Sequence, residues 1–342
     1  MLEMRKNNLE IRKEHEAVRN SVGYYDFTHQ LLEVTGKDAK AFLDYVFVAN
    51  IGNSKVGDAK YTTMLNEEGI IIDDVIVFMI AEERFWISTL YINELIAWFD
   101  SHNKDFEVVY EDITNKVTMY AVQGPKSREV LNKFLSEPVD SIKYFSITDN
   151  KIDDIPVRIA RMGYTGELGY EIYCTPDDKP LVESKLDEAG KEFGILNLGT
   201  DVIITSLPRE KGYVLMSDLA GTNPLEVDFG WTVNWKKDFI GKEALEKVKA
   251  EGAKRSLLGF TIEDDEIEIA PGSIAKLNDE IVGKVTVFTY GYTVEKSIGF
   301  VLVDNDKAKI GDIVNIVVET KEIPATLVDR VFYDPSHERI KG

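Results

Sequence analysis

Two adjacent aspartates, Asp73 and Asp74, stand inside an apolar run rich in isoleucine and valine. Such a run is typical of a strand, and successive side chains of a strand point to opposite faces, so the two carboxylates cannot both face solvent. An inward carboxylate costs roughly several kcal/mol unless it is paired or hydrogen-bonded, and burial raises its pKa. Acids with raised pKa values are common general acids or bases. The pattern also fits an acid that caps a turn at a strand end.

A second cluster of polar residues spans positions 163–171, with the sequence GYTGELGYE. Its three glycines permit a tight loop and a close approach of the backbone to a ligand. Tyr164 offers an aromatic face, and a carboxylate such as Glu171 can accept two N–H donors from an amino-heterocycle at once. An ordinary hairpin turn explains the same residues equally well. The cluster lacks the features of a phosphate-binding loop.

Metal and serine-hydrolase chemistry have little support in the sequence. The four histidines show no paired ligand spacing, Cys174 is the single cysteine, and no G-x-S-x-G motif occurs. We therefore predict no metal site. The tryptophans are expected in the core or at domain interfaces, at positions Trp86, Trp98, Trp231 and Trp235.

The elements that must position these residues alternate between strands and helices. Residues 33–123 follow a β-α-β-β-α-β pattern, which predicts a ferredoxin-like unit whose last strand lies at 117–122. A helix at 179–193 follows two further strands. A charged helix at 242–251 then connects to short strands separated by glycines, a pattern that predicts a small barrel or jelly roll.

The composition limits the partners. With 342 residues the chain suits two or three domains. Its 60 acidic and 40 basic residues give a formal charge of −20, which repels nucleic acid and anionic membrane surfaces. No stretch has the ~18–20 apolar residues of a membrane span, and residues 1–19 lack the apolar core of a signal peptide. We predict a cytoplasmic protein with neither nucleic acid nor membrane as a partner.

Six motifs occur along the chain, at 22–29 (VGYYDFTH), 66–74 (NEEGIIIDD), 123–125 (QGP), 163–171 (GYTGELGYE), 222–226 (TNPLE) and 238–245 (DFIGKEAL). In type and order they resemble motifs of the T-protein (aminomethyltransferase) family of the glycine cleavage system, which includes folate-dependent demethylases of the same fold. The resemblance spans nearly the whole chain.

The resemblance implies an α+β fold, a three-domain cloverleaf around a central folate channel. Its first, folate-binding domain would be split in sequence, with residues 1–32 and 124–250. Residues 33–123 would form the ferredoxin-like second domain, and residues 251–342 the C-terminal β-barrel or jelly-roll domain.

The resemblance also implies roles for individual residues. Asp74 would be the catalytic carboxylate, beside N5 of the cofactor tetrahydrofolate. Glu171 would bind the amino edge of the pterin. The remaining cofactor-binding residues would line the cavity: Tyr61, Ser88, Tyr144 and Tyr164.

Three departures from the family pattern concern the substrate. Ile70 replaces the second glycine of a G-G pair, and Ser88 stands near the position of a cavity asparagine. Gly199-Thr200-Asp201 lacks the arginine of the family's G-A-R-D. The anionic tail of folate therefore needs another partner, for which Arg209 is a candidate.

We expect a tetrahydrofolate-dependent one-carbon transferase, with aminomethyl transfer that gives methylenetetrahydrofolate and ammonia as the favoured reaction. Its partners would be the small-molecule folate and a lipoyl carrier protein, the H-protein, which would dock on local lysines such as Lys236, Lys237 and Lys242. Two alternatives stay open: a tetrahydrofolate-dependent demethylase of a small methylated amine, sulfonium or aryl ether, and a non-catalytic folate-binding accessory protein.

Overall fold

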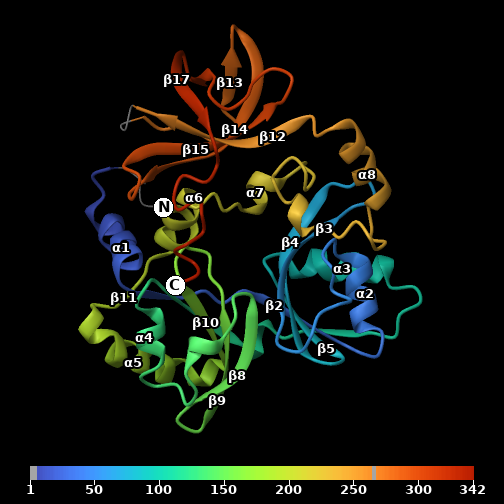
Figure 1. Cartoon of the computed structure of the whole chain (residues 1–342), viewed down its shortest axis with the longest axis vertical. Coiled ribbons are helices and arrows are strands. Elements are labelled where there is room, and N and C mark those ends of the chain that lie inside the picture. The colour runs from blue at the N-terminus through green and yellow to red at the C-terminus, as the bar shows by residue number, and fades with distance from the viewer. Residues whose placement is uncertain (1–5, 264–266) are drawn as a thin grey trace.

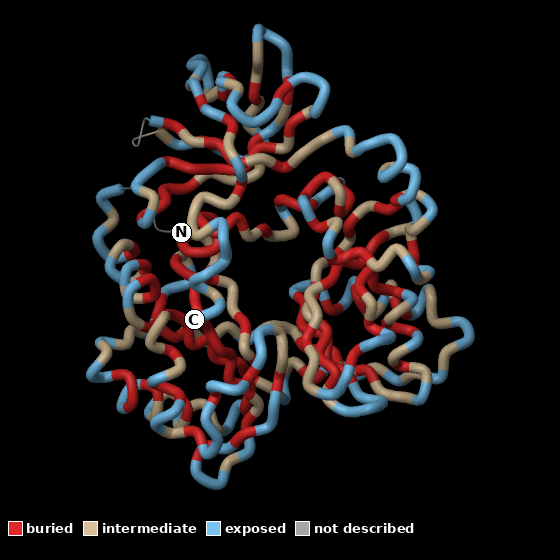
Figure 2. The backbone as a smooth tube through the Cα atoms, viewed as in Figure 1, coloured by how far each residue is buried: buried red, intermediate tan, exposed pale blue. Residues whose placement is uncertain are grey.

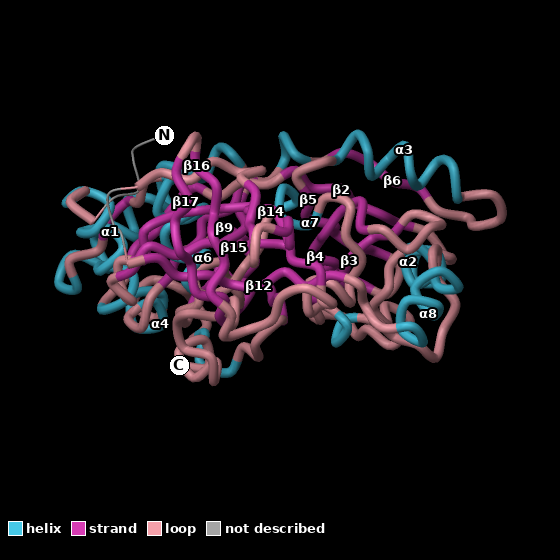
Figure 3. Tube along the Cα trace, turned by 90° about the horizontal axis from the view of Figure 1, so that it is seen from above, coloured by secondary structure: helices cyan, strands magenta, loops and turns pink. Residues whose placement is uncertain are grey.

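The structure, a computed structural model, describes residues 6–263 and 267–342. Three lobes surround a common centre: two helix-covered sheets and a barrel (Figure 1). Seen from above, strands run through the middle, and the helices α1 (Leu9–Asn20), α3 (Ile92–His102) and α8 (Lys242–Glu251) lie toward the periphery (Figure 3). Among the described residues, no helix has the length and apolar character needed to cross a bilayer.

The first sheet has six strands in the order β11-β1-β7-β10-β9-β8. β1 and β11 pair in parallel, and the other neighbours pair antiparallel. Helices α4 (Ser127–Leu131) and α5 (Lys179–Gly190) cover one face, where Tyr120, Val122 and Ile172 pack against them. The strands are β1 (Gly23–Asp26), β7 (Thr118–Gln123), β8 (Ser146–Ile152), β9 (Ile155–Arg161), β10 (Gly169–Cys174) and β11 (Leu196–Asn197).

The second sheet has five antiparallel strands in the order β3-β4-β5-β2-β6. α2 (Ala39–Val46) and α3 cover one face. The order β6-β2-β5-β4 is that of a ferredoxin-like unit, and β3 extends it at one edge. The strands are β2 (Gln30–Thr35), β3 (Ala59–Leu65), β4 (Ile71–Ala81), β5 (Arg84–Thr89) and β6 (Val109–Asp112).

The last strand of the predicted ferredoxin-like unit is a different one. The sequence assigned residues 117–122 to it, but β7 pairs with β1 and β10 in the first sheet, and β6 takes the place beside β2. All six residues of β7 are buried, as expected for a central strand, whereas β6 is short and mostly exposed, as expected for an edge. β2 also begins at Gln30, ahead of the predicted boundary at residue 33.

The two sheets pack together through the faces that their helices leave free. Met119 and Ala121 of the first sheet meet Phe78 and Trp86 of the second. Figure 2 shows buried backbone in the interior of both lobes.

The alternation of side chains along β4 decides the direction of the two aspartates. Val75 and Val77 pack under the helices, whereas Ile76 and Phe78 face the first sheet. By the same alternation Asp73 points toward the helices and Asp74 toward the first sheet. The predicted opposition of the two carboxylates is confirmed.

The C-terminal lobe is a closed antiparallel barrel in the order β12-β15-β14-β13-β16-β17. This confirms the α+β class and the predicted C-terminal barrel, which is reached through α8 at the bounds that the sequence predicts. Its strands are β12 (Arg255–Ile262), β13 (Ile274–Leu277), β14 (Glu280–Gly291), β15 (Lys296–Asp304), β16 (Ile313–Val318) and β17 (Lys321–Val328).

An irregular segment at 199–240 fills the space between the lobes. It contains a π-helical turn at Val202–Ser206 and the short helices α6 (Leu207–Glu210) and α7 (Met216–Leu219). Its Val214 and Phe229 pack with side chains from the end of the second sheet and from the barrel. This segment therefore joins the three lobes where the candidate site lies.

Ion pairs to buried carboxylates also connect segments that are far apart in the sequence. Arg19 of α1 contacts Glu167 at 3.2 Å and Glu210 at 3.0 Å. Arg339, near the C-terminus, donates to Glu167 at 2.9 Å. The 163–171 loop is thus held from two sides.

Candidate functional site

Asp74 and Tyr61 lie together on the face of the second sheet that is directed at the first. The Tyr61 hydroxyl donates a hydrogen bond of 2.9 Å to Oδ2 of Asp74. The register of β3 and β4 places Tyr61 opposite Ile76, so Asp74 is its diagonal neighbour on the same face. Burial raises the pKa of Asp74 to about 6, and the Tyr61 hydrogen bond acts against this rise. A half-buried carboxylate with such a pKa can exchange a proton near neutral pH.

Asp73 has a different environment. It is 2% exposed. Thr89 Oγ1 donates to its Oδ2 at 2.7 Å, and the backbone N–H of Asp74 donates to its Oδ1 at 2.9 Å. Burial raises the pKa of Asp73 to about 7. Both oxygens are satisfied within the protein, so Asp73 has the partners of a structural acid.

Glu171 lies on β10, on the face that meets the second sheet. It is 8% exposed, and the Tyr173 hydroxyl donates to its Oε2 at 2.7 Å. No described residue donates to Oε1. Burial raises the pKa of Glu171 to about 7. One carboxylate oxygen is thus left for another donor.

Tyr164 stacks on a residue that the sequence did not single out. Its ring lies 5.5 Å from that of Tyr213 at an interplanar angle of 23°, and its hydroxyl donates to the Val214 carbonyl. Burial raises the pKa of Tyr164, and the charge of Asp74 adds to the rise. Tyr213 follows a glycine in a loop, where no periodicity marks a functional side chain.

The two other predicted cavity residues, Ser88 and Tyr144, have partners of their own. Ser88 faces the same side as Asp74, because it pairs with Ile76, and its hydroxyl contacts His29 Nδ1 at 3.1 Å. Burial lowers the pKa of His29 to about 4, so this imidazole is neutral at pH 7. Tyr144 is 39% exposed and lies against Phe145 at 4.6 Å. The structure therefore brings Tyr61, Asp74 and Tyr164 into one cluster, and the Tyr144 hydroxyl is linked to it through the side chain of Tyr213, on which Tyr164 stacks.

A pocket of about 230 Å³ opens beside Tyr61. Trp231 forms part of its wall and stacks on Tyr61 at 6.2 Å and 24°. The indole is 71% exposed, so the expectation that Trp231 is a core or interface residue was wrong. Its ring covers one side of Tyr61 at the mouth of the site. The pocket is lined by Ala49, Ala59, Lys60, Tyr61, Phe145, Trp231 and Thr232.

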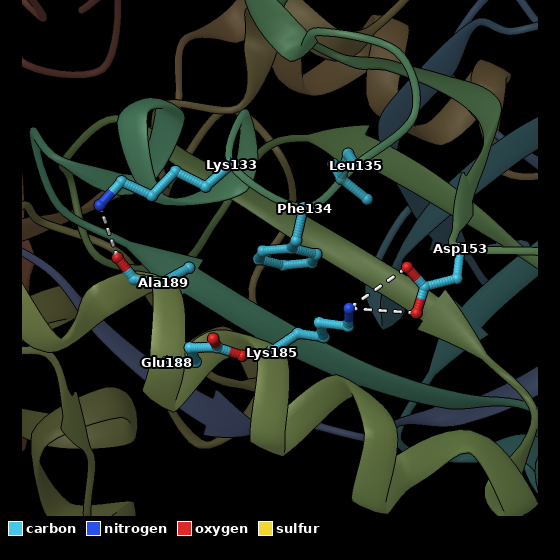
Figure 4. A pocket seen from close by; sticks show the side chains of 7 residues that line it. All are labelled: Lys133, Phe134, Leu135, Asp153, Lys185, Glu188 and Ala189. Atoms are coloured by element: carbon cyan, nitrogen blue, oxygen red, sulfur yellow. Dashed lines mark hydrogen bonds and ion pairs between the residues drawn. The ribbon is translucent and has the colours of Figure 1, made fainter.

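A larger pocket, of about 470 Å³, lies on the far side of the first sheet, around Phe134 (Figure 4). None of the predicted site residues lines it. Its charged side chains already have partners, since Lys185 pairs with Asp153 at 3.0 Å and Lys133 donates to the Ala189 carbonyl at 3.0 Å. This pocket carries no chemistry that the sequence predicts.

The cations considered at the sequence level are largely engaged. Arg209, the candidate for an anionic tail, donates to Asp218 at 2.6 Å and is 3% exposed. Lys237 donates to the carbonyls of Asp44 and Phe47. They stabilise the segment between the lobes.

Comparison with known proteins covers both parts of the chain. Residues 4–237 match the family model of the GCVT N-terminal domain, and residues 255–334 match that of the glycine cleavage T-protein C-terminal barrel domain. An aminomethyltransferase of Clostridium botulinum (strain Loch Maree / Type A3) is 36% identical over 327 residues, which cover 94% of this chain and 88% of that protein. One of Thermoanaerobacter sp. (strain X514) is 33% identical over 336 residues, or 96% and 91% of the two chains.

A solved structure agrees with these sequences. The glycine cleavage system aminomethyltransferase T from Bartonella henselae superposes with a TM-score of 0.86 at 25% identity, over 95% of this chain and 90% of that one. The chain therefore belongs to the aminomethyltransferase family, the T-proteins of the glycine cleavage system.

Proposed function

We propose that this chain transfers an aminomethyl-borne one-carbon unit from a lipoyl carrier protein to tetrahydrofolate, releasing ammonia and forming methylenetetrahydrofolate. One observation supports this most: Asp74, with its pKa near 6 and one oxygen held by Tyr61, lies at the meeting point of the lobes. The aminomethyltransferases to which the chain is similar match 94% of its length or more.

The residues present suit a reduced folate. A pterin carries adjacent N–H donors, and Glu171 has an oxygen with no donor from the described residues. A flat heterocycle packs well on aromatic rings, which Tyr164 and Tyr213 supply. Tyr173, which holds Glu171, contacts Phe78, four residues along β4 from Asp74. Those four residues span about 13 Å, a length that a two-ring heterocycle hydrogen-bonded at both ends can bridge.

Asp74 is the residue to which we assign the chemistry. Tetrahydrofolate supplies a nucleophilic nitrogen, N5, that accepts the one-carbon unit. A carboxylate beside that nitrogen accepts or orients its proton and stabilises positive charge as it develops. Because Tyr61 occupies Oδ2, Oδ1 is the oxygen available for this task. Both carboxylate oxygens of Asp73 already accept hydrogen bonds from the protein, so Asp73 is not assigned this role.

The pocket beside Tyr61 is the route that we assign to the donor. It is open to solvent at Trp231 and ends on the ring whose hydroxyl holds Asp74. An exposed aromatic ring at such a mouth suits the apolar arm of a carrier. Of the three lysines proposed for carrier docking, Lys237 is engaged with carbonyls and Lys242 lies 3.2 Å from Asp238, so Lys236 is the one to test first.

Product analysis tests the proposed function. The protein is incubated with tetrahydrofolate and either aminomethylated H-protein or a panel of methylated amines, sulfonium compounds and methoxyarenes, and the folates are resolved by mass. Methylenetetrahydrofolate from the H-protein reaction alone supports aminomethyl transfer. Methyltetrahydrofolate from a small donor indicates a demethylase instead. Tight folate binding with neither product indicates a non-catalytic binding protein.

A further inference from the structure

Three arginines are buried in the part of the chain that the structure describes, and two of them are matched by carboxylates. Arg19 lies between Glu167 and Glu210, and Arg209 pairs with Asp218 at 2.6 Å. Their charges are therefore compensated where they are buried, as buried charges generally are.

Arg330 is the exception. It is 8% exposed, and its only carboxylate within 4 Å among the described residues is Asp228, at 3.9 Å, whose side chain is 78% exposed. Nη2 donates to the Val227 carbonyl at 3.0 Å. Nε and Nη1 are buried and have no hydrogen-bond partner in the described structure. Arg209 Nε is also without a partner, but Asp218 matches that residue's charge. A buried guanidinium with unmet donors costs folding free energy, so its presence calls for a ligand or another function.

The position of Arg330 links it to the candidate site. Its guanidinium carbon lies 6.0 Å from the ring centroid of Phe229. Phe229 in turn meets Tyr61 edge to face at 5.4 Å, and Tyr61 donates to Asp74. Arg330 therefore lies two aromatic rings away from the proposed catalytic carboxylate.

We propose that Arg330 is the anion-binding residue of this site and receives a carboxylate of the glutamate tail of folate, an inference that rests on the proposed function. In a pterin, the side chain leaves the ring at C6, the atom next to N5. If N5 lies at Asp74, the tail begins near Tyr61 and is directed toward Phe229, which meets Tyr61 edge to face. The aromatic ring in the tail packs against Phe229, and the carboxylate beyond it meets the unmatched guanidinium.

The charge of the whole chain makes a local cation necessary. A net charge of −20 repels an anionic tail at long range, so an attraction must come from a nearby group. A guanidinium forms two parallel hydrogen bonds to one carboxylate, and it does so more strongly where water is excluded. Each of the two edges that can bind a carboxylate pairs Nη2 with either Nε or Nη1. Nε and Nη1 have no hydrogen-bond partner in the described structure, and Nη2 gives one of its two protons to the Val227 carbonyl.

Calorimetry with two ligands tests this assignment. 5-Formyltetrahydrofolate carries the glutamate tail, whereas 6-methyltetrahydropterin has the same type of ring and no carboxylate. Arg330→Met should weaken the folate about 10- to 100-fold, the loss expected for a charged hydrogen-bonded pair, and should change the binding of the pterin by less than about twofold. Arg330→Lys should recover part of the affinity, because it restores the charge without the planar edge.

Thermal unfolding supplies the control for a merely structural role. Arg330→Met should melt no lower than the wild type, because it removes an uncompensated buried charge. Arg209→Met should melt lower, because it leaves Asp218 buried without its partner.

Three results would overturn the assignment: equal losses for both ligands, an unchanged folate affinity, and a loss confined to the KM of the one-carbon donor. If the wild-type protein binds neither ligand, the proposed function itself fails, and this outcome is distinct from the other three.

Discussion

The Tyr61 hydroxyl lies 2.9 Å from Oδ2 of Asp74 and is its side-chain hydrogen-bond donor. Two opposing influences thus act on one carboxylate, because burial raises its pKa and the hydroxyl lowers it, with a result of about 6. Such a group is largely ionised at pH 7 and becomes protonated as the pH falls toward 5. The pH dependence of turnover should report this balance.

Tyr61→Phe should move the acidic limb of the kcat profile upward by about one pH unit, since one charge-assisted hydrogen bond is worth roughly 1.4 kcal/mol. Turnover should fall several-fold at pH 6 and recover by pH 8. Tyr164→Phe is the matched control, because that hydroxyl donates to the Val214 carbonyl and not to Asp74. If the acidic limb of the kcat profile shifts equally in both variants, the Tyr61 hydroxyl does not set the pKa of Asp74.

Glu171→Gln should weaken the binding of reduced folate about 10- to 100-fold, because a neutral amide replaces a charged acceptor. The same change should stabilise the protein at high pH. Burial raises the pKa of Glu171 from 4.5 to about 7, so the stability linked to its neutral form is fully present below pH 4.5 and is lost as the pH rises to 7. The variant should therefore melt about 2–4 °C above the wild type at pH 8 and match it at pH 4.5. A melting difference that does not change with pH would contradict this account.

Glu210→Gln should destabilise the fold by about 3–5 kcal/mol, because it leaves Arg19 with a single buried carboxylate. Burial alone would raise the pKa of Glu210, but hydrogen bonds from His15 and Thr293 and the charge of Arg19 lower it to about 2. The stability it provides is present above pH 4.5 and is lost as the pH falls toward 2. The free energies of unfolding of the wild type and the variant, measured as the pH is lowered, should converge over that range. A difference in the free energy of unfolding that stays constant with pH would show that Glu210 does not cause the loss of stability in acid.

Trp231→Ala should leave the free energy of unfolding within about 0.5 kcal/mol, because the indole is 71% exposed. If the pocket beside Tyr61 admits the donor, the KM for the carrier protein should rise about tenfold, and the affinity for folate should change little. Trp231→Phe, which keeps a ring over Tyr61, should be close to the wild type. A larger effect on folate than on the carrier would assign Trp231 to the cofactor instead.

Local pattern was enough to predict most of the fold. The charged helix at Lys242–Glu251 and the barrel beyond it follow from helical spacing and glycine-bounded strands. Local pattern did not predict which of the two sheets a given strand joins. Thr118–Gln123 has the periodicity of a strand, and nothing local says which of two sheets it enters.

The same holds for the candidate site: local sequence pattern revealed some of its residues, and the others depend on how the lobes pack. The adjacent carboxylates of Asp73 and Asp74 were recognisable because alternation along a strand forces one of them inward. Tyr213 and Arg330 were not recognisable, since both lie in irregular segments, and their roles depend on packing between lobes. The exposure of Trp231 likewise depends on where the mouth of the pocket forms.

The rate of methylenetetrahydrofolate formation by Asp74→Asn and Asp73→Asn, measured side by side, tests the central claim most directly. Asp74→Asn keeps the shape of the side chain and removes its charge, so kcat should fall about 10²- to 10⁴-fold while folate binding is largely retained. Asp73→Asn should mainly lower the melting temperature, because Thr89 and a backbone N–H then share one amide oxygen. Equal losses of kcat in the two variants, or full activity of Asp74→Asn, would contradict the assignment of Asp74 as the catalytic carboxylate.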